Sequence, residues 1–143
     1  MKCTVITGES EREEVVIYCR RRTPLVERIE RLADSDDDRL LGFKNGEVTV
    51  LNTSDVYCFV VENNKVQAVL ENEKFTLKQR LYIIEECLGP EFIKINQSCV
   101  ANLEKILKFD TTVAGSLKVI FKNGYVDYVS RRNIKSIKER LGL

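Results

Sequence analysis

The chain contains no histidine among its 143 residues. Histidine is the side chain most often used for general acid–base catalysis near neutral pH, and it is the commonest ligand of transition metals. Without it, a hydrolase would need a pair of carboxylates or a cysteine or lysine nucleophile, and none of these stands in a motif. We therefore predict that the protein is not an enzyme and that it needs no cofactor and no metal.

Cysteine is present without a pattern, and long apolar runs are missing. No Cys-x-x-Cys pair occurs, which argues against both a zinc site and a disulfide framework. We expect free, mostly buried thiols at the five cysteines, which are Cys3, Cys19, Cys58, Cys87 and Cys99. No segment approaches the roughly 18 apolar residues of a membrane span, and the first residues lack the apolar stretch of a signal peptide. The expected location is therefore cytoplasmic, with no membrane insertion.

The net charge is only +1, but the charges are unevenly distributed. From Phe92 to Leu143 the chain has ten Lys or Arg and four Asp or Glu, a net charge of +6. The first 91 residues therefore carry a net charge of −5. This asymmetry favours a basic surface for nucleic acid or another polyanion, and an ordinary solvated charged face is the alternative.

The first 39 residues predict a small β-β-α unit that ends in an acidic linker. Residues 2–7 and 14–19 are rich in Val, Ile and Tyr, which is typical of strands. Thr23-Pro24 is typical of a helix start, because proline fits the first helical position. We therefore divide the chain into an N-terminal extension, residues 1–39, and a main domain, residues 40–143.

The next segment predicts two hairpins followed by a helix. Asn45-Gly46 separates two strand-like runs, and Asn63-Asn64 separates the next two; Asn-Gly is the strongest short hairpin signal. Thr76-Leu77-Lys78-Gln79 resembles a capping box, which predicts a helix from Thr76 to Leu88. The apolar positions Leu81, Ile84 and Leu88 should then face a sheet.

The last third of the chain predicts short strands and a closing helix. Strands are expected at residues 92–95 and 103–109, and a further hairpin joins 117–121 to 125–128 through Asn123-Gly124. The final helix should run over residues 131–141. We expect its buried stripe to consist of Ile134, Ile137 and Leu141.

The start of the final helix is a candidate anion site. Ser130 suits the N-cap position, and the first helical residues are Arg131 and Arg132. Unpaired backbone N–H groups and two guanidiniums at one place can bind phosphate oxygens or guanine edges. Lys135 lies one turn further on the solvent side. The alternative is an ordinary amphipathic helix with a solubilising face.

Two polar loops are further candidates. Asn96, Gln97 and Ser98 could contact adenine and phosphate, or Asn96 and Ser98 could simply cap a short helical turn. Asn64 and Lys65 form a second polar loop, for which a plain hairpin turn is the alternative. Cys99 adjoins the first loop, where we expect an inert thiol, with redox sensitivity as the alternative.

These features, taken in order, resemble the LytTR domain of LytR/AlgR-type bacterial transcription regulators. The resemblance covers residues 40–143 and consists of an aromatic, a basic residue and a serine before an apolar stretch and an asparagine. An Asn-Gly hairpin and a helix start with Ser and Arg follow. The matching residues are Phe92, Lys94, Ser98, Val100, Asn102, Leu103, Ile106, Asn123, Gly124, Val129, Ser130 and Arg131 or Arg132.

The resemblance implies a mainly β fold, an elongated sandwich of three antiparallel sheets with short helices. It also implies a sequence-specific DNA-binding transcription regulator that inserts loops into successive major grooves of double-stranded DNA. The matching positions are Asn96, Gln97 and Ser98 in one loop, Arg132 with Arg131 at the last helix, and Asn64 with Lys65 in a hairpin turn.

The expected assembly is a homodimer on paired or repeated half-sites. The 39 residues before the domain are too few for a receiver domain, so a stand-alone regulator is expected. A regulatory protein partner is a further possibility for the N-terminal extension. The alternative function is a protein–protein interaction module that uses β-edges or the acidic N-terminal unit.

Overall fold

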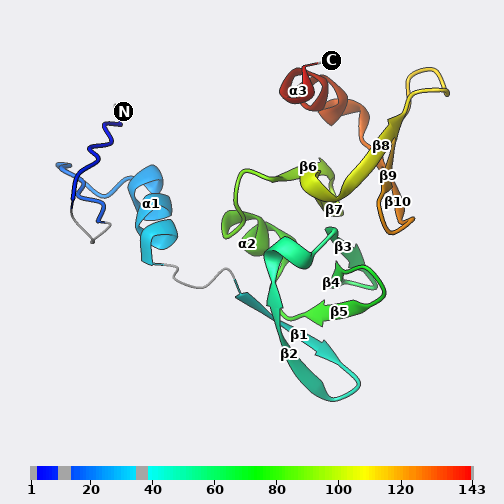
Figure 1. Cartoon of the computed structure of the whole chain (residues 1–143), viewed down its shortest axis with the longest axis horizontal. Helices are drawn as coiled ribbons and strands as arrows, with labels where there is room; N and C mark the ends of the chain where they lie inside the picture. The colour runs from blue at the N-terminus through cyan, green and yellow to red at the C-terminus, as the bar shows by residue number, and fades with distance from the viewer. Residues whose placement is uncertain (1–2, 10–13, 35–38, 143) are drawn as a thin grey trace. The chain divides into compact units, whose positions relative to one another are not determined.

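The computed structural model describes residues 3–9, 14–34 and 39–142, and the chain divides into two compact units. The N-terminal unit spans Met1–Asp36 and the C-terminal domain spans Asp37–Leu143. The described strands all belong to the second unit, and the described part of the first unit contains a helix (Figure 1).

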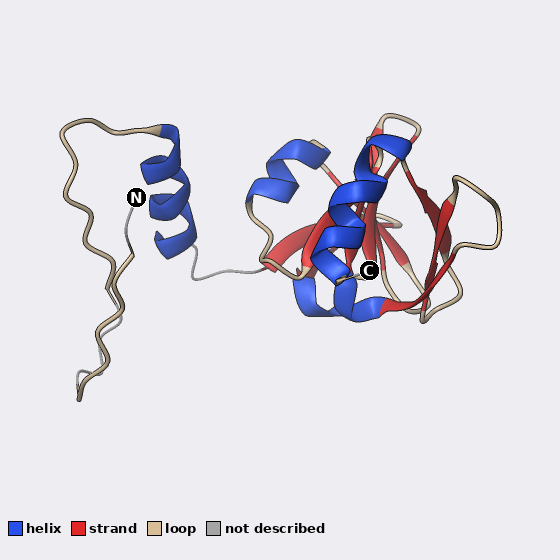
Figure 2. Ribbon diagram, turned by 90° about the horizontal axis from the view of Figure 1, so that it is seen from above, coloured by secondary structure: helices blue, strands red, loops and turns tan. Residues whose placement is uncertain are grey.

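The N-terminal unit has the predicted helix but not the predicted strands. Helix α1 (Pro24–Asp34) begins as expected: Thr23 accepts hydrogen bonds from the backbone N–H groups of Val26 and Glu27. The expectation of two strands is wrong for the residues described here, since 3–9 and 14–19 contain no strand (Figure 2). A strand needs a hydrogen-bonding partner and a packed face. Val26 is the single buried hydrophobic residue in the described part of this unit.

The C-terminal domain is built from antiparallel strands and short helices (Figure 1). Its described elements in chain order are β1 (Arg39–Lys44), β2 (Glu47–Asn52), η1 (Thr53–Asp55), β3 (Cys58–Glu62), β4 (Lys65–Val69), β5 (Lys74–Leu77), α2 (Leu81–Glu86), β6 (Phe92–Asn96), β7 (Cys99–Asn102), η2 (Leu103–Lys105), β8 (Ile106–Asp110), β9 (Leu117–Phe121), β10 (Val126–Val129) and α3 (Arg131–Leu141). The mainly β fold with short helices is therefore confirmed.

The described strands form two sheets, with orders β2-β1-β5-β4-β3-β7-β6 and β10-β9-β8. The resemblance implied three sheets. The difference depends on one strand pair, Phe43 with Thr76, which joins the β1–β2 hairpin to the other five strands. If that pair is set aside, the strands fall into groups of two, five and three.

The first two hairpins form as predicted. Asn45 (φ 51°) and Gly46 (φ 78°) both have positive φ, as do Asn63 (φ 51°) and Asn64 (φ 62°). A two-residue turn with positive φ at both positions matches the right-handed twist of the strands that it connects. Asparagine tolerates this conformation better than most residues do.

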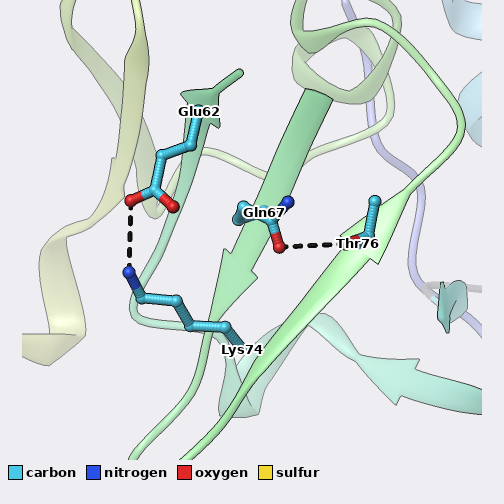
Figure 3. A network of polar contacts seen from close by, with 4 residues as sticks. All are labelled: Glu62, Gln67, Lys74 and Thr76. Atoms are coloured by element: carbon cyan, nitrogen blue, oxygen red, sulfur yellow. Dashed lines mark hydrogen bonds and ion pairs between the residues drawn. The ribbon is translucent and has the colours of Figure 1, made fainter. Parts of the chain in front are cut away.

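The predicted helix start at Thr76 is wrong. Residues 74–77 form strand β5, in which Phe75 and Leu77 are buried, and Thr76 donates to Gln67 on β4 over 3.1 Å (Figure 3). The alternating burial of apolar side chains in a sheet outweighs a local capping motif. The helix is instead α2, which begins at Leu81, and its Leu81 and Ile84 are buried as expected.

Two hydrophobic clusters lie on opposite faces of the seven-stranded sheet. The first lies toward the three-stranded sheet and α3, and it includes Cys58, Cys99 and Ile137. The second includes Phe59 and Ile84 of α2. Since neighbouring residues of β3 enter different clusters, this strand is buried on both faces. Residues 99–102 form β7, a strand that the sequence analysis did not predict, and β8 begins only at Ile106.

Candidate nucleic-acid interface

Two hairpin turns lie at the same end of the seven-stranded sheet. Strands β3 and β7 are antiparallel, with Val60 opposite Cys99, and the Val61 N–H donates to the Ser98 carbonyl over 2.8 Å. The end of β3 is therefore beside the start of β7. It follows that the β3–β4 turn at residues 63–64 and the β6–β7 turn at 97–98 project from the same end of the sheet.

Helix α3 begins at this same end. The Ser130 N–H donates to the Ile95 carbonyl over 2.8 Å, which fixes the helix start beside the last residues of β6. Near its other end, Arg140 donates to the carbonyl of Pro90, just before β6. The helix thus runs back along β6, and its first residues, Arg131 and Arg132, lie beside the β6–β7 turn.

We call this end of the domain the turn end. It is defined by the β3–β4 turn, the β6–β7 turn and the first two turns of α3. It brings together all of the site residues that the sequence suggested, which are Asn64, Lys65, Asn96, Gln97, Ser98, Arg131, Arg132 and Lys135. Of these, only Asn96 is partly buried, and the other seven are exposed.

The side chain of Asn96 is fully used inside the protein. Its Nδ2 donates to Asp127 Oδ1 over 3.0 Å and to the Tyr128 carbonyl over 2.8 Å, and its Oδ1 accepts from the Ser98 N–H over 2.8 Å. A register irregularity between Lys94 and Asn96 marks a β-bulge, a feature that re-aims side chains. Asn96 therefore shapes the turn and ties it to β10, and its amide cannot contact a base without breaking these bonds.

Gln97 and Ser98 form the tip of the turn that Asn96 shapes. Both are exposed, and they occupy the two turn positions between β6 and β7. The expectation that Asn96 and Ser98 cap a helical turn does not hold, because residues 96–99 form a hairpin. The Gln97 amide and the Ser98 hydroxyl are the polar groups that this hairpin presents outward.

Ser130 occupies the predicted N-cap position without acting as a side-chain cap. Its backbone is extended (φ −64°, ψ 149°), and its carbonyl accepts from Asn133 and Ile134. However, its hydroxyl makes no cap hydrogen bond, and it is buried with no partner among the described residues. The first N–H groups of α3 are therefore not satisfied by this side chain.

Within the described part of the chain, the two arginines at the start of α3 have no intramolecular partner of the kind that many other cations of the domain have. Among the described residues, Arg131 and Arg132 make no ion pair and no cation–π contact. Lys74, by contrast, pairs with Glu62 over 3.1 Å (Figure 3). Further lysines that are engaged by an acid, a ring or a carbonyl are Lys44, Lys78, Lys105 and Lys122. The two guanidiniums are thus available to an external anion.

Asp127 is a site residue that the sequence analysis missed. Its Oδ1 accepts from Asn96 and, over 2.7 Å, from the Tyr128 N–H. Its sequence neighbours on β10 give no signal of this role, because the partner lies 31 residues away. Asp127 holds the turn in place and also puts one negative charge beside the basic residues.

A comparison with protein families identifies the domain. A family model described as the LytTr DNA-binding domain matches residues 46–142. The chain belongs to this family. The resemblance seen in the sequence is thereby confirmed.

Relatives and a solved structure extend the match. In Staphylococcus aureus strain NCTC 8325, a protein named an uncharacterized HTH-type transcriptional regulator is 40% identical over 104 residues, covering 73% of this chain and 71% of that protein. A protein of the same name in the bovine strain RF122 is 39% identical over the same length. A LytTr DNA-binding domain of a Bacillus cereus protein superposes with a TM-score of 0.69 at 19% identity, covering 73% of this chain and 97% of that one. This last likeness shows the fold.

The thiols of the chain differ from the expectation that most are buried. Only Cys58 and Cys99 are buried, whereas Cys3, Cys19 and Cys87 are exposed. A hydrogen bond with Cys58, followed by burial, raises the pKa of the Cys99 thiol far above its usual range. A protonated, buried thiol is a poor nucleophile. Cys99 therefore packs in the core behind the β6–β7 turn, where burial disfavours its thiolate form.

Other kinds of site find no support in the described part of the chain. No group of three His, Cys, Asp or Glu side chains there could hold a metal ion. None of the described helices combines the length and apolar character that crossing a membrane requires.

Proposed function

We propose that this LytTr protein is a sequence-specific transcription regulator that binds double-stranded DNA through its turn end. The observation that carries the proposal is the hydrogen bond from Ser130 to Ile95, which sets the Arg131–Arg132 helix start beside the β6–β7 turn. Two exposed arginines, the first N–H groups of α3 and a polar turn then lie at the same end of the sheet. Such a surface suits phosphates and the edges of bases in a major groove.

Each residue of the turn end has a distinct role in the proposal. Arg132, with Arg131 beside it, makes bidentate contacts to guanine or phosphate. Gln97 contacts a base edge and Ser98 a phosphate. Lys65, on the β3–β4 turn, and Lys135 add phosphate contacts, and Asn64 supports the turn that carries Lys65. Asn96 is a positioning residue.

The proposed contacts come from turns and a helix start, not from a two-helix motif. The curated relatives carry the name HTH-type transcriptional regulator. In the described residues of this chain, strands separate α1 from α2 and α2 from α3. The turn end therefore takes the place that a recognition helix would have. Two copies on repeated half-sites would double the contact area, and the free energies by which each copy discriminates between sequences would add.

The test is DNA binding measured by fluorescence anisotropy, with sites first selected from a random duplex pool. We expect affinity to fall steeply with salt, because lysines and arginines displace counterions from phosphates. Arg132→Ala should weaken binding by about 1–3 kcal/mol, the range for loss of a bidentate contact. Lys108→Ala, which removes an exposed cation from the middle of β8, is the matched control and should bind normally.

Two results would contradict the proposal. One is the absence of any selected sequence or low-salt binding with the full chain. The other is an equal loss of affinity for Arg132→Ala and Lys108→Ala, which would indicate a diffuse charge effect with no defined site. A protein-interaction module would give the first result. The family membership does not favour that alternative.

A further inference from the structure

We propose that residues 14–20 pair with the same segment of a second copy of the chain, antiparallel and centred on Ile17. The interface would be a two-stranded ladder between chains, formed by residues of the N-terminal unit and by none of the turn-end residues. The proposal concerns protein association alone and does not depend on DNA binding.

The N-terminal unit exposes apolar surface that it cannot bury by itself. Ile6 is 90% exposed and Tyr18 is 95% exposed, and Val5, Val15 and Val16 are each more than half exposed. A chain of fewer than about 40 residues rarely folds stably without disulfides, metals or association. All its cysteines are free, and no metal-binding cluster occurs in its described residues. Association with a second copy of the chain would cover this surface.

The segment has the composition of a strand but lacks a partner strand. Val15, Val16, Ile17 and Tyr18 belong to the residue types most favoured in strands. In the described residues the segment forms no strand, and Figure 2 shows it as a drawn-out loop. A second chain that offers the same segment would supply the missing hydrogen-bonding edge.

The sequence of the segment is complementary to itself when two copies run antiparallel. With Ile17 opposite Ile17, Glu14 lies opposite Arg20, and Val16 lies opposite Tyr18. Opposite charges and an aromatic with a β-branched residue are both favourable cross-strand pairs. A two-fold axis repeats each pair, so one dimer contains two Glu14–Arg20 pairs.

Registers shifted by two residues match less well. One shift places Glu14 opposite Tyr18. The other places Val16 opposite Arg20 and Glu14 opposite Arg22, an arginine that already pairs with Glu30. Each shift therefore sets a charge against an apolar or aromatic side chain. Neither Glu14 nor Arg20 forms an ion pair with another described residue, whereas the nearby Arg22 pairs with Glu30 over 3.0 Å. The two charges at the ends of the segment therefore favour a second copy over an acidic or a basic partner.

Charge reversal tests the proposal by sedimentation equilibrium of the full chain without DNA. The wild-type chain should dimerise at micromolar concentrations. Glu14→Arg or Arg20→Glu should each weaken dimerisation about tenfold, since two attractive cross-strand pairs become repulsive. The double variant Glu14→Arg/Arg20→Glu should restore wild-type dimerisation. Arg28→Glu is the control for Arg20→Glu, because it changes the net charge of the chain by the same amount at an exposed position of α1. It should have little effect on dimerisation.

Cross-linking tests the register. In a chain with Cys3→Ser, Cys19→Ser and Cys87→Ser, Ile17→Cys places a thiol opposite its own copy, and mild oxidation should give a disulfide-linked dimer. Val5→Cys in the same background should cross-link far less. A chain that stays monomeric at high concentration overturns the proposal. So does a double variant that dimerises no better than the single reversals. Neither result would affect the DNA-binding proposal, because the turn end is unchanged.

Discussion

The two units of this chain use similar residues with opposite results. In the N-terminal unit, Val15, Val16 and Tyr18 stand in a strand-like sequence and remain exposed without forming a strand. In the C-terminal domain, the β3 sequence Cys58–Glu62 also alternates little, yet it forms a strand buried on both faces. The difference is the presence of neighbours. β3 pairs with β4 and β7, and a hydrophobic cluster covers each face.

This contrast shows that the strand propensity of a residue depends mostly on the side chains and strands that surround it. A β-branched or aromatic residue gains free energy when it packs against cross-strand and same-face neighbours, and it gains little in isolation. The C-terminal domain supplies these neighbours within one chain. We propose that a second copy of the chain supplies them to the N-terminal unit, so that the same kind of sequence forms a core in one unit and an interface in the other.

The largest expected difference between the units is in the response to truncation of an aromatic side chain. Phe59→Ala removes a fully buried ring that packs at a tilt against Phe92, with ring centroids 5.8 Å apart, and should lower the free energy of unfolding by about 3–5 kcal/mol. Tyr18→Ala, measured at a dilution where the chain is monomeric, should change it by less than about 0.5 kcal/mol. Urea unfolding followed by circular dichroism measures both. A loss at Tyr18 as large as that at Phe59 would mean that the N-terminal unit packs internally.

The second expected difference lies inside the turn end. It is between Asn96, which positions the β6–β7 turn, and Gln97, which is exposed at the tip of that turn. Asn96→Ala removes three hydrogen bonds and should lower the free energy of unfolding by roughly 1–3 kcal/mol. It should weaken DNA binding as well, because the turn loses its link to Asp127. Gln97→Ala should leave stability within about 0.5 kcal/mol of wild type while altering base preference.

A conservative variant sharpens this second comparison. Asn96→Asp keeps an acceptor for the Ser98 N–H but sets a carboxylate against Asp127, so the link to β10 should fail by like-charge repulsion. Restored binding in Asn96→Asp/Asp127→Asn would support the positioning role. If Asn96→Ala left stability unchanged and only altered base preference, Asn96 would be a base-reading residue after all.

Local chemistry explains which parts of the fold could be predicted from sequence. The turns at Asn45-Gly46 and Asn63-Asn64 were predictable because the left-handed conformation depends on those residues alone. Helix α3 was predictable from the spacing of Ile134, Ile137 and Leu141. The strand at Lys74–Leu77 was missed because its capping-box motif is local, whereas burial of Phe75 depends on distant strands.

The same reasoning explains the candidate site. Charge and capping patterns identified the Arg131–Arg132 helix start, and the family resemblance identified the β6–β7 turn. What neither could provide was the role of Asn96, since its partners Asp127 and Tyr128 are 31 and 32 residues away. The unused hydroxyl of Ser130 was also unforeseen, because burial beside β6 decides it. These contacts between residues distant in sequence are the reason why we propose a positioning role for Asn96.

The smallest expected effect concerns a carboxylate that shapes a loop of the C-terminal domain. The Thr112 N–H donates to Asp110 Oδ1 over 2.9 Å at the start of the β8–β9 loop, and this bond holds the pKa of Asp110 below its usual range. Because the folded-state pKa is the lower one, the stabilisation is present above the unfolded pKa, about 3.9. It is lost as pH falls through the folded pKa.

Asp110→Asn keeps an acceptor for Thr112 but removes the titrating group, so the acid-side fall in stability should become shallower. Glu9→Gln in the N-terminal unit removes one carboxylate from an exposed position and serves as the control in the same pH series. Equal slopes for Asp110→Asn and wild type would show that the loop does not depend on the charged form of Asp110.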